Sequence, residues 1–477
     1  MRPGDTVASA LWRVGVRTFT RSLKYHRRRG PFCGTGDCPS CLVTVDGVPG
    51  VRSCVTPARD GMRVRRERGW PSAERDALSI LDRLHVLLPV GFYHKAFVRP
   101  RWLWGVAERW IRRTVGLGRL SSGGPRRVTA RTVRCDVLVV GAGAAGRAAA
   151  VSAAARGADV VWCDEGEVRE QPDGIEVLSN HAAIGVYEGP TVPIASEEEL
   201  VEVHPGRIVV ATGATEAHPV FPGNDLPGVL LGRAAAGFAR RGVAPAGRAV
   251  VVVEHDEGFE HVAVLREAGV AIAAVVVSTS LADRVPDGLR AFVGADVVRA
   301  DGKERVRFAV LRDAEGVTRG IGCEWFVFSV GLWPRDDLLR MAGPGEPVEG
   351  VGDAAADAAP AAASGEGVVC LCEDVSFADL DRAWREGYRS SELLKRYTTA
   401  TMGPCRGAMC GRHLADFAAA RTIEKGATIA AARTTSRPPV RPVPLAALAA
   451  AVHPVIEKCT SLHDVHVAAG ARMGWSG

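Results

Sequence analysis

Three cysteines lie close together near the start of the chain, in the stretch PFCGTGDCPSCLVTVDG (residues 31–47). With a fourth cysteine further on they form the pattern C-x4-C-x2-C-x12-C, whose members are Cys33, Cys38, Cys41 and Cys54. This is the ligand spacing of a plant-type [2Fe–2S] cluster. Glycines let the loop fold tightly around the sulfides, and an Asp-Gly hairpin turn returns the fourth cysteine to the loop. The alternative is a zinc knuckle, which generally pairs two short C-x2-C hooks that are not present here.

A second set of four cysteines follows the pattern C-x1-C-x32-C-x4-C near the other end of the chain. VVCLCEDVS supplies Cys370 and Cys372, and MGPCRGAMC supplies Cys405 and Cys410, with a helical stretch between. Two thiolate pairs presented from loops at helix ends suit a second small [2Fe–2S] cluster. Zinc is the alternative, because paired cysteine hooks are also typical of zinc sites. The other four cysteines are isolated and are interpreted as ordinary thiols: Cys135, Cys163, Cys323 and Cys459.

A dinucleotide site is expected between the two cysteine sets. CDVLVVGAGAAGRAAAVSAAARGADVVWCDEG reads as a strand, a glycine-rich turn, an Ala-rich helix and a second strand. In this motif the first glycine makes the turn, the second admits the pyrophosphate, and the third lets the helix pack on the strand. An acid about 20 residues further on holds a ribose hydroxyl; Asp164 is favoured and Glu165 is the alternative. The turn residues expected to contact the nucleotide are Gly141, Gly143, Ala144, Ala145 and Gly146.

Two further segments indicate a two-dinucleotide flavoprotein-like fold. The strand-end turn Ala211-Thr212-Gly213 is expected to return the chain to the first nucleotide. The element Gly352-Asp353 looks like the one whose carboxylate and following helix start face the ribityl–phosphate region of the flavin. Each segment alone is also compatible with an ordinary strand–turn–helix junction, but together, in this order, they favour the flavoprotein-like fold.

A second Rossmann unit is expected around residues 245–330. RAVVVVEHDEGFEHVAVLREAGVAIAAVVV has the strand, helix and strand, but its turn places Glu254 and Glu257 where a pyrophosphate needs bare backbone. Carboxylates there oppose phosphate binding. The unit is therefore predicted to have the fold without a nicotinamide site, which speaks against a reductase fed by NAD(P)H.

Length, composition and charge indicate the number of domains, the kind of partner and the cellular location. The chain has 477 residues, of which 47% are hydrophobic, enough for about two to four domains. The net charge of +6 is mild, and we expect no nucleic-acid partner. Without a signal peptide or membrane span, the chain is expected to be cytoplasmic. The basic, aromatic and amphipathic stretch GFYHKAFVRPRWLWGVAERWIRRTVGLGRL favours a subunit interface, with peripheral contact to the inner face of the membrane as the open alternative.

The order of segments resembles the α subunit of the heterotetrameric sarcosine oxidase group. This group extends to opine oxidase, hydrogen cyanide synthase and dye-linked proline or hydroxyproline dehydrogenase complexes. Collinear matches carry the resemblance: GDTVASAL, RSLKYHRRRG, CVTPARDGMRV, LLPVGFYHKAF, ATGATE, FPGNDLPGV, SVGLWPRDDLL, LKRYTTATMG and RPPVRPVPLAALA. The C-terminal cysteine spacing resembles a bacterioferritin-associated-ferredoxin domain. Because the sequence stops at residue 477, we expect a short form without the aminomethyltransferase-like domain, which puts folate-linked chemistry in doubt.

The resemblance implies a division of labour between subunits. A flavoprotein β subunit of the glycine or D-amino-acid oxidase type would oxidise a C–N bond of a secondary amine or N-substituted glycine, and a further small subunit is compatible with this reading. The present chain would hold two [2Fe–2S] clusters and FAD, with NAD or another adenine nucleotide as alternatives, and FMN would lie at the interface with the β subunit. It would transfer electrons without catalytic residues of its own, to oxygen, a quinone or a protein carrier. His26, His94 and His218 are interpreted as structural or interface residues.

The expected fold is α/β: a two-dinucleotide-binding Rossmann fold flanked by two iron–sulfur domains. The predicted ranges are a ferredoxin-like domain at 1–66, an interface segment at 67–130, the dinucleotide-binding domain at 131–365, a helical bacterioferritin-associated-ferredoxin-like domain at 366–425 and a tail at 426–477. Two other functions remain open. One is a free-standing NAD(P)H-dependent flavin and iron–sulfur reductase, and the other is a non-catalytic iron–sulfur sensor or store.

Overall fold

A computed structural model describes residues 2–85, 90–91, 101–115, 127–359, 366–423, 433–450 and 461–471. The chain divides into two compact units, each made of several chain segments. Unit 1 comprises Met1–Gly123, Thr212–Arg340 and Gly350–Ser436. Unit 2 comprises Gly124–Ala211, Met341–Glu349 and Arg437–Gly477.

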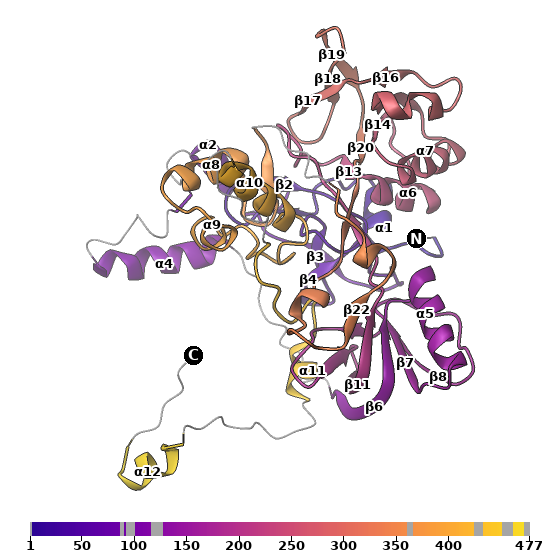
Figure 1. The fold of residues 1–477 in the computed structure, drawn as a ribbon. Coiled ribbons are helices and arrows are strands. Elements are labelled where there is room, and N and C mark those ends of the chain that lie inside the picture. Colours follow the sequence, from indigo (N-terminus) through magenta and orange to yellow (C-terminus); the bar gives the residue numbers. More distant parts are fainter. Residues whose placement is uncertain are drawn as a thin grey trace. The chain divides into compact units, whose positions relative to one another are not determined.

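Unit 2 is built on one mixed sheet (Figure 1). Four of its strands run parallel, in the order β8 (Ile175–Ser179), β7 (Val160–Asp164), β6 (Thr129–Val140) and β11 (Glu199–Val210). Helix α5 (Ala144–Ala155) follows β6 directly, so the predicted strand, turn, helix and strand are present. The remaining strands and helices of the unit are β9 (Ala182–Ala183), β10 (Val192–Ala195), β22 (Val348–Gly350), α11 (Leu445–Ala449) and α12 (His463–Ala468).

Unit 1 contains the second Rossmann unit, a five-stranded parallel sheet with two helices in its crossovers. The strand order is β13 (Val229–Leu231), β20 (Trp325–Ser329), β14 (Ala249–Val253), β15 (Ile272–Val277) and β16 (Ala291–Val293). The crossover helices are α6 (Gly232–Arg240) and α7 (Glu257–Glu267). An antiparallel sheet and a strand pair accompany it: β17 (Asp296–Asp301), β18 (Phe308–Arg312) and β19 (Thr318–Gly322), then β12 (Ala214–Glu216) with β21 (Leu332–Pro334).

The N-terminal part of unit 1 carries the predicted hairpin after the first cysteine set. Strand β3 (Leu42–Val45) pairs with β4 (Val48–Arg52) and with β5 (Val64–Arg66). All four residues of β3, the central strand of its sheet, are buried. Other elements here are α1 (Val7–Arg13), β1 (Thr20–Arg21), β2 (Arg28–Arg29), α2 (Ile80–Arg83) and α4 (Arg101–Val115).

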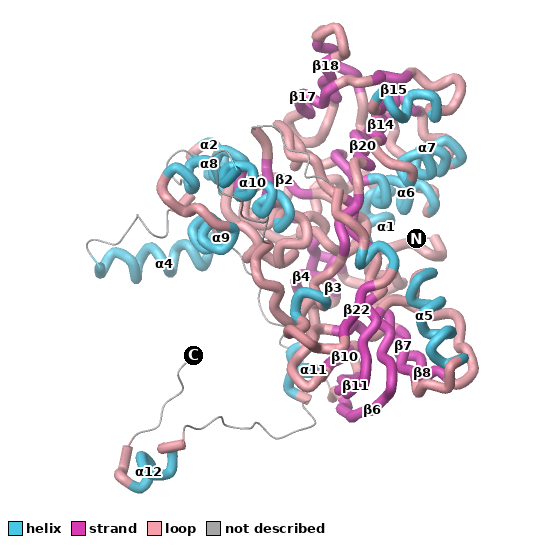
Figure 2. The backbone as a smooth tube through the Cα atoms, viewed as in Figure 1, coloured by secondary structure: helices cyan, strands magenta, loops and turns pink. Residues whose placement is uncertain are grey.

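The C-terminal part of unit 1 is mostly helical, as Figure 2 shows in cyan. Two short strands, β23 (Val368–Cys370) and β24 (Val375–Ser376), precede the helices. The helices are α8 (Phe377–Arg385), α9 (Ser391–Thr398) and α10 (Gly411–Ile423). Helix α8 begins with a capping box in which Ser376 and Asp379 exchange hydrogen bonds with each other's backbone N–H groups.

Some predicted segments fall partly outside the described residues. Of the interface segment 67–130, residues 86–89, 92–100 and 116–126 lie outside, and with them His94. Of the tail 426–477, residues 426–432, 451–460 and 472–477 lie outside, and with them Cys459. In the part of the chain that is described, no helix combines the length and the apolarity needed to cross a membrane.

Candidate cofactor sites

The four N-terminal cysteines are brought together and buried in unit 1. Cys41 directly precedes β3 and Cys54 follows β4, so the hairpin carries Cys54 back to the loop. The thiol of Cys33 hydrogen-bonds with those of Cys38 and Cys54, and Cys41 hydrogen-bonds with Cys54. The Cys38 N–H also donates to the Cys33 Sγ at 3.4 Å. The loop therefore directs backbone N–H groups at sulfur, as expected of a loop around a cluster.

Glycine is required in this loop for two reasons. Gly34 and Gly36 have φ of +72° and +76°, a conformation that side chains rarely adopt. Gly34 also approaches helix α6, because a Cβ added to it would lie 2.5 Å from the Cα of Ala234. Asp37 holds the loop from the other side, since its Oδ2 accepts hydrogen bonds from the Thr215 hydroxyl at 3.1 Å and from Arg335 at 2.5 Å. The loop conformation thus depends on packing against the second Rossmann unit.

The four C-terminal cysteines form a closed ring of sulfur contacts. Cys370 contacts Cys372 and Cys410, and Cys405 contacts the same two thiols. All four are buried, Cys370 at the end of β23 and Cys410 directly before α10. Gly403 makes room for the ring, because a Cβ there would lie 2.2 Å from the Cβ of Cys372. The predicted four cysteines of this set are therefore neighbours in space.

Each set brings four cysteine sulfurs together. A [2Fe–2S] cluster takes two sulfurs for each of two irons. Cys33 with Cys38 and Cys41 with Cys54 offer such pairs. Hydrogen bonds between neighbouring thiols lower the pKa of Cys33 and Cys370 and raise the pKa of Cys38 and Cys372.

A buried ion-pair network joins the two cysteine regions. Arg29 of β2 contacts Asp374, two residues after Cys372, with Nη2 to Oδ1 at 2.5 Å. Its Nη1 lies 2.5 Å from Asp225 Oδ2. The Tyr25 N–H donates to the other oxygen of Asp374 at 3.0 Å. Cysteines of both sets also belong to one continuous hydrophobic core. Sequence spacing contains no signal for this junction, because the partners are far apart along the chain.

The glycine-rich turn of unit 2 has the geometry that a pyrophosphate needs. Gly141 has φ +112°, and a Cβ on Gly146 would lie 1.9 Å from the Gly141 carbonyl oxygen. Gly143 is the N-cap of α5 without a side-chain cap, and a Cβ on it would meet nothing within 4 Å. Ala144 and Ala145 form the first turn of α5. The helix N-terminus therefore presents N–H groups beside open space, which is a favourable site for a phosphate.

Asp164 lies beside this turn, whereas Glu165 is engaged elsewhere in unit 2. The Oδ2 of Asp164 accepts a hydrogen bond from the Ala142 N–H at 2.6 Å, and its Oδ1 accepts from the Gly166 N–H at 2.7 Å. Glu165 pairs with Arg441 at 2.7 Å. Of the two candidates, the geometry favours Asp164 as the acid at the nucleotide.

The other predicted dinucleotide residues are distributed over both units. Ala211 ends the unit 2 segment, and its N–H donates to the Val140 carbonyl at 2.8 Å. Thr212, Gly213, Gly352 and Asp353 belong to unit 1. The Thr212 hydroxyl donates to the Arg335 carbonyl at 2.6 Å, and Gly213 and Gly352 both have positive φ. Positive φ explains the choice of glycine at both positions.

The strand ends of the second Rossmann unit hold a network that the sequence analysis missed. Glu216 is buried and accepts a hydrogen bond from the Arg233 N–H at 2.9 Å. Ser329 bridges Glu216 (3.5 Å) and His261 Nδ1 (2.8 Å). His261 Nε2 lies 3.5 Å from Glu257, which also pairs with Arg233. Burial raises the pKa of Glu216 to about 8.

This network revises the electrostatic prediction made for Glu257. Burial opposes its ionisation, but His261 and Arg233 hold the pKa of Glu257 well below the usual range. Its charge is therefore compensated, and the expected repulsion of a phosphate does not come from this residue. Gly232 is closed off as well, because a Cβ on it would lie 2.1 Å from the Ser329 hydroxyl and from His261. The strand ends are filled by side chains.

Two of the histidines considered in the sequence analysis have buried, structural surroundings. His26 Nδ1 lies 2.7 Å from Asp76, and both are buried. His218 is fully buried, and its Nε2 donates to the Val369 carbonyl at 3.3 Å. The Nε2 of His413 donates to the His218 carbonyl at 2.9 Å. Burial lowers the pKa of His218 well below the usual value. A neutral, enclosed imidazole of this kind supports the core.

Comparison with known proteins assigns three regions of the chain. Residues 1–69 match a 2Fe-2S iron-sulfur cluster binding domain, and residues 136–221 match an FAD binding domain. Residues 364–452 match the sarcosine oxidase A3 domain. These matches support an iron–sulfur cluster and FAD in the chain.

Similar proteins have been named in bacteria. Sarcosine oxidase subunit alpha of Rhizobium meliloti is 29% identical, over 94% of this chain and 56% of that protein. Hydrogen cyanide synthase subunit HcnA of Pseudomonas aeruginosa is 45% identical, over 13% of this chain and 61% of that protein. The chain thus spans little more than half the length of the first relative. The resemblance predicted from the motifs is confirmed, because the chain is a homologue of these subunits.

The fold also has a counterpart among solved structures. L-proline dehydrogenase from P. horikoshii superposes with a TM-score of 0.65 at 18% identity, covering 93% of this chain and 94% of that one. At this identity the likeness concerns the fold. With the N-terminal and FAD-binding matches, it confirms the predicted α/β fold class.

Proposed function

We propose that this chain is the electron-transfer subunit of a multi-subunit flavin and iron–sulfur amine or amino-acid oxidase or dehydrogenase. It would accept electrons from a flavoprotein β subunit that oxidises the C–N bond of a secondary amine or N-substituted glycine. The observation that carries the proposal is the presence of two separate groups of four buried cysteines within unit 1. A single-electron carrier needs such buried thiolate sites, and a protein that only binds substrate does not.

The metal ligands in this proposal are the eight grouped cysteines. Cys33, Cys38, Cys41 and Cys54 would hold one [2Fe–2S] cluster, and Cys370, Cys372, Cys405 and Cys410 would hold the second. Such clusters supply one-electron oxidation and reduction. The chain's own contribution is to bury the sulfurs, to donate the Cys38 N–H to sulfur and to hold both loops on a common core.

The dinucleotide in this proposal is FAD, with NAD or another adenine nucleotide as the alternative. Gly141, Gly143 and Gly146 would receive the pyrophosphate, with the first turn of α5 supplying N–H donors. Asp164 would hold a ribose hydroxyl. The filled strand ends around Ser329 and His261 are the reason that no nicotinamide site is assigned to the second Rossmann unit.

The proposed partner is a β subunit of the glycine or D-amino-acid oxidase type, with FMN held at the interface between the subunits. Helix α4 offers a surface for such contact, because Trp102 and Val106, one helical turn apart, are 72% and 59% exposed. Exposed tryptophans are frequent at protein interfaces. The names of the relatives, which denote subunits, support the existence of a partner.

The proposal is tested by purifying the chain with the products of neighbouring genes and counting its cofactors. We expect about four irons, two for each cluster, together with FAD, FMN and a flavoprotein partner. Cys54→Ser and Cys405→Ser should each remove about two irons, while the matched control Cys323→Ser, a buried thiol outside both sets, should keep all of them. Zinc in place of iron, or a monomer without flavin, would refute the proposal.

A further inference from the structure

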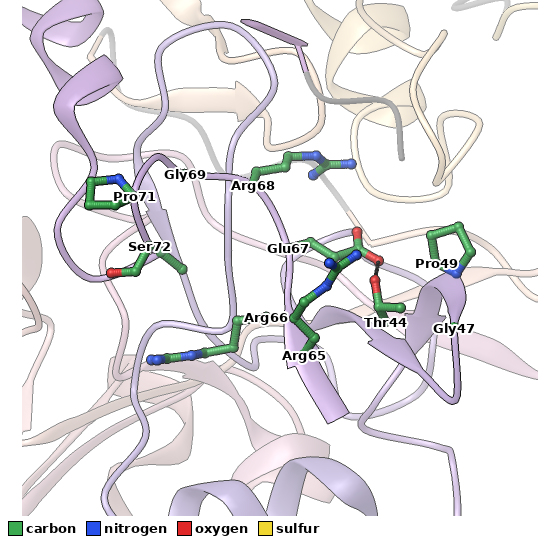
Figure 3. Close-up of a pocket in the computed structure, with 11 residues that line it drawn as sticks. Thr44, Gly47, Pro49, Arg65, Arg66, Glu67, Arg68, Gly69, Pro71 and Ser72 are labelled. Carbon is green, nitrogen blue, oxygen red and sulfur yellow. Dashed lines mark hydrogen bonds between the residues drawn. The ribbon is translucent and has the colours of Figure 1, made fainter. Parts of the chain in front are cut away.

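A cavity of about 390 Å³ lies beside the three-stranded sheet in the N-terminal part of unit 1 (Figure 3). Its walls come from Thr44 of β3, the β3–β4 turn, strand β5 and the loop at residues 67–73. None of the residues assigned above to a cofactor lines it. Pockets for small ligands typically measure about 300–1,000 Å³, so this cavity has the size for one.

More positive than negative side chains line the cavity. Three arginines line it (Arg65, Arg66 and Arg68) against one carboxylate, Glu67. Glu67 Oε1 already accepts hydrogen bonds from the Thr44 hydroxyl at 3.1 Å and from the Gly50 N–H at 2.5 Å. Arg66 forms an ion pair with Glu74. Within the described residues, neither Arg65 nor Arg68 has a carboxylate at ion-pair distance, although Glu67, Glu373 and Asp374 act on the charge of Arg68 from further away.

The strand register decides which arginines face the same side. Arg65 lies opposite Thr44 in the β3–β5 pair, whereas Arg66 lies opposite Val43. Because successive side chains of a strand alternate, Arg65, Thr44 and Glu67 share one face. Figure 3 agrees: the Arg65 side chain extends toward Glu67 and Thr44, and Arg66 points the other way.

The loop that carries Arg68 is held in one conformation. Arg68 and Gly69 have φ of +55° and +108°, and a Cβ on Gly69 would lie 2.6 Å from the Ser72 carbonyl oxygen. The loop is fixed from outside, because Arg21 Nε donates to the Ala73 carbonyl at 2.6 Å. A cavity wall that is already ordered loses little entropy when it binds a ligand.

Arg68 also has an unused donor. Its Nη1 donates to the Arg21 carbonyl at 3.2 Å, but its buried Nε has no acceptor in the described part of the chain. Burial lowers the pKa of the Arg68 guanidinium. Buried donors in folded proteins normally have an acceptor, so an acceptor is expected beside this one.

We propose that this cavity binds a small organic or inorganic oxyanion, whose phosphate or carboxylate group is held by Arg65 and Arg68. Guanidinium groups match both of these anions with paired hydrogen bonds. Small and uncharged residues complete the lining: Gly47, Pro49, Gly69, Pro71, Ser72 and Ala73. No member of the cysteine sets or of the glycine-rich turn lines the cavity.

The test is calorimetric titration of the purified complex with inorganic phosphate and, separately, with succinate at constant ionic strength. We expect one of the two probes to bind, which identifies the anion. Arg65→Gln and Arg68→Gln should each weaken that binding about tenfold or more, the loss expected for one charge-assisted contact. Arg63→Gln is the matched control, because Arg63 is exposed on the same segment but does not line the cavity.

Two results would overturn the inference: neither probe binds, or the Arg65→Gln variant binds as tightly as the wild type. Since Arg65 is exposed, its replacement should not affect folding, and the variant stays informative even if Arg68→Gln misfolds. The iron and flavin content of each variant is measured in parallel. Unchanged cofactors with lost anion binding would separate this site from the proposed electron-transfer function.

Discussion

Replacing Arg29 by glutamine should destabilise unit 1 strongly. The guanidinium side chain is 2% exposed and lies between the carboxylates of Asp225 and Asp374, 2.5 Å from each. The Asp374 side chain is fully buried. Without Arg29, Asp374 keeps the hydrogen bond from the Tyr25 N–H at 3.0 Å. A buried carboxylate would then have lost the positive charge that compensates it.

Removing one partner of a buried ion pair costs about 3–5 kcal/mol, chiefly because the other charge stays buried. This is a large share of the roughly 5–15 kcal/mol that stabilises a typical domain. The adjacent residue gives a matched control. Arg28 pairs with Glu304, whose side chain is 66% exposed, and Arg28→Gln should therefore cost about 0–1 kcal/mol.

The assay is urea unfolding of the two variants, followed by tryptophan fluorescence and by iron content. Adding Asp374→Asn to Arg29→Gln should recover part of the loss, because it removes the uncompensated charge; a coupling of about 1–3 kcal/mol is expected for residues in direct contact. If Arg29→Gln and Arg28→Gln unfold within about 1 kcal/mol of each other, the argument for a buried network joining the two cysteine regions is wrong.

Three further predictions use single positions. Gly34→Ala should lower the free energy of unfolding by more than the roughly 1–2 kcal/mol that a left-handed conformation costs, because the added Cβ would also clash with Ala234. Gly47→Ala is the control in the same urea assay: its Cβ meets nothing within 4 Å, so it should lower the free energy of unfolding by that amount alone. Because the pKa of Glu216 is raised to about 8, the free energy of unfolding of the wild type should fall as pH rises from about 4.5 to 8, by up to about 1.4 kcal/mol per pH unit. Unfolding of Glu216→Gln, measured over the same pH range, should not show this loss. Gly143→Ala should leave thermal unfolding unchanged, because its Cβ meets open space, yet lower the flavin content; unchanged flavin would contradict the site.

The parts that could be predicted from the sequence are those encoded within short stretches. A strand, a glycine turn and a helix are contiguous, so the Gly141–Gly146 motif could be assigned to its strand–turn–helix fold from the sequence. The hairpin after Cys41 was readable for the same reason, since an Asp-Gly turn reverses the chain. The ion pair of Glu257 could not be predicted, because its partner Arg233 lies on another helix.

By itself, the sequence determined the kinds of ligand and their spacing: two sets of four cysteines and one glycine-rich turn with an acid after its second strand. Tertiary structure alone decided what surrounds them. Arg29 meets Asp374 across 345 residues, and Ser329 meets His261 across 68. The Arg65 and Arg68 cavity depends on a strand register and on a loop held by Arg21. Such contacts depend on how helices and strands pack, and the spacing of residues along the chain does not predict which distant side chains will be neighbours.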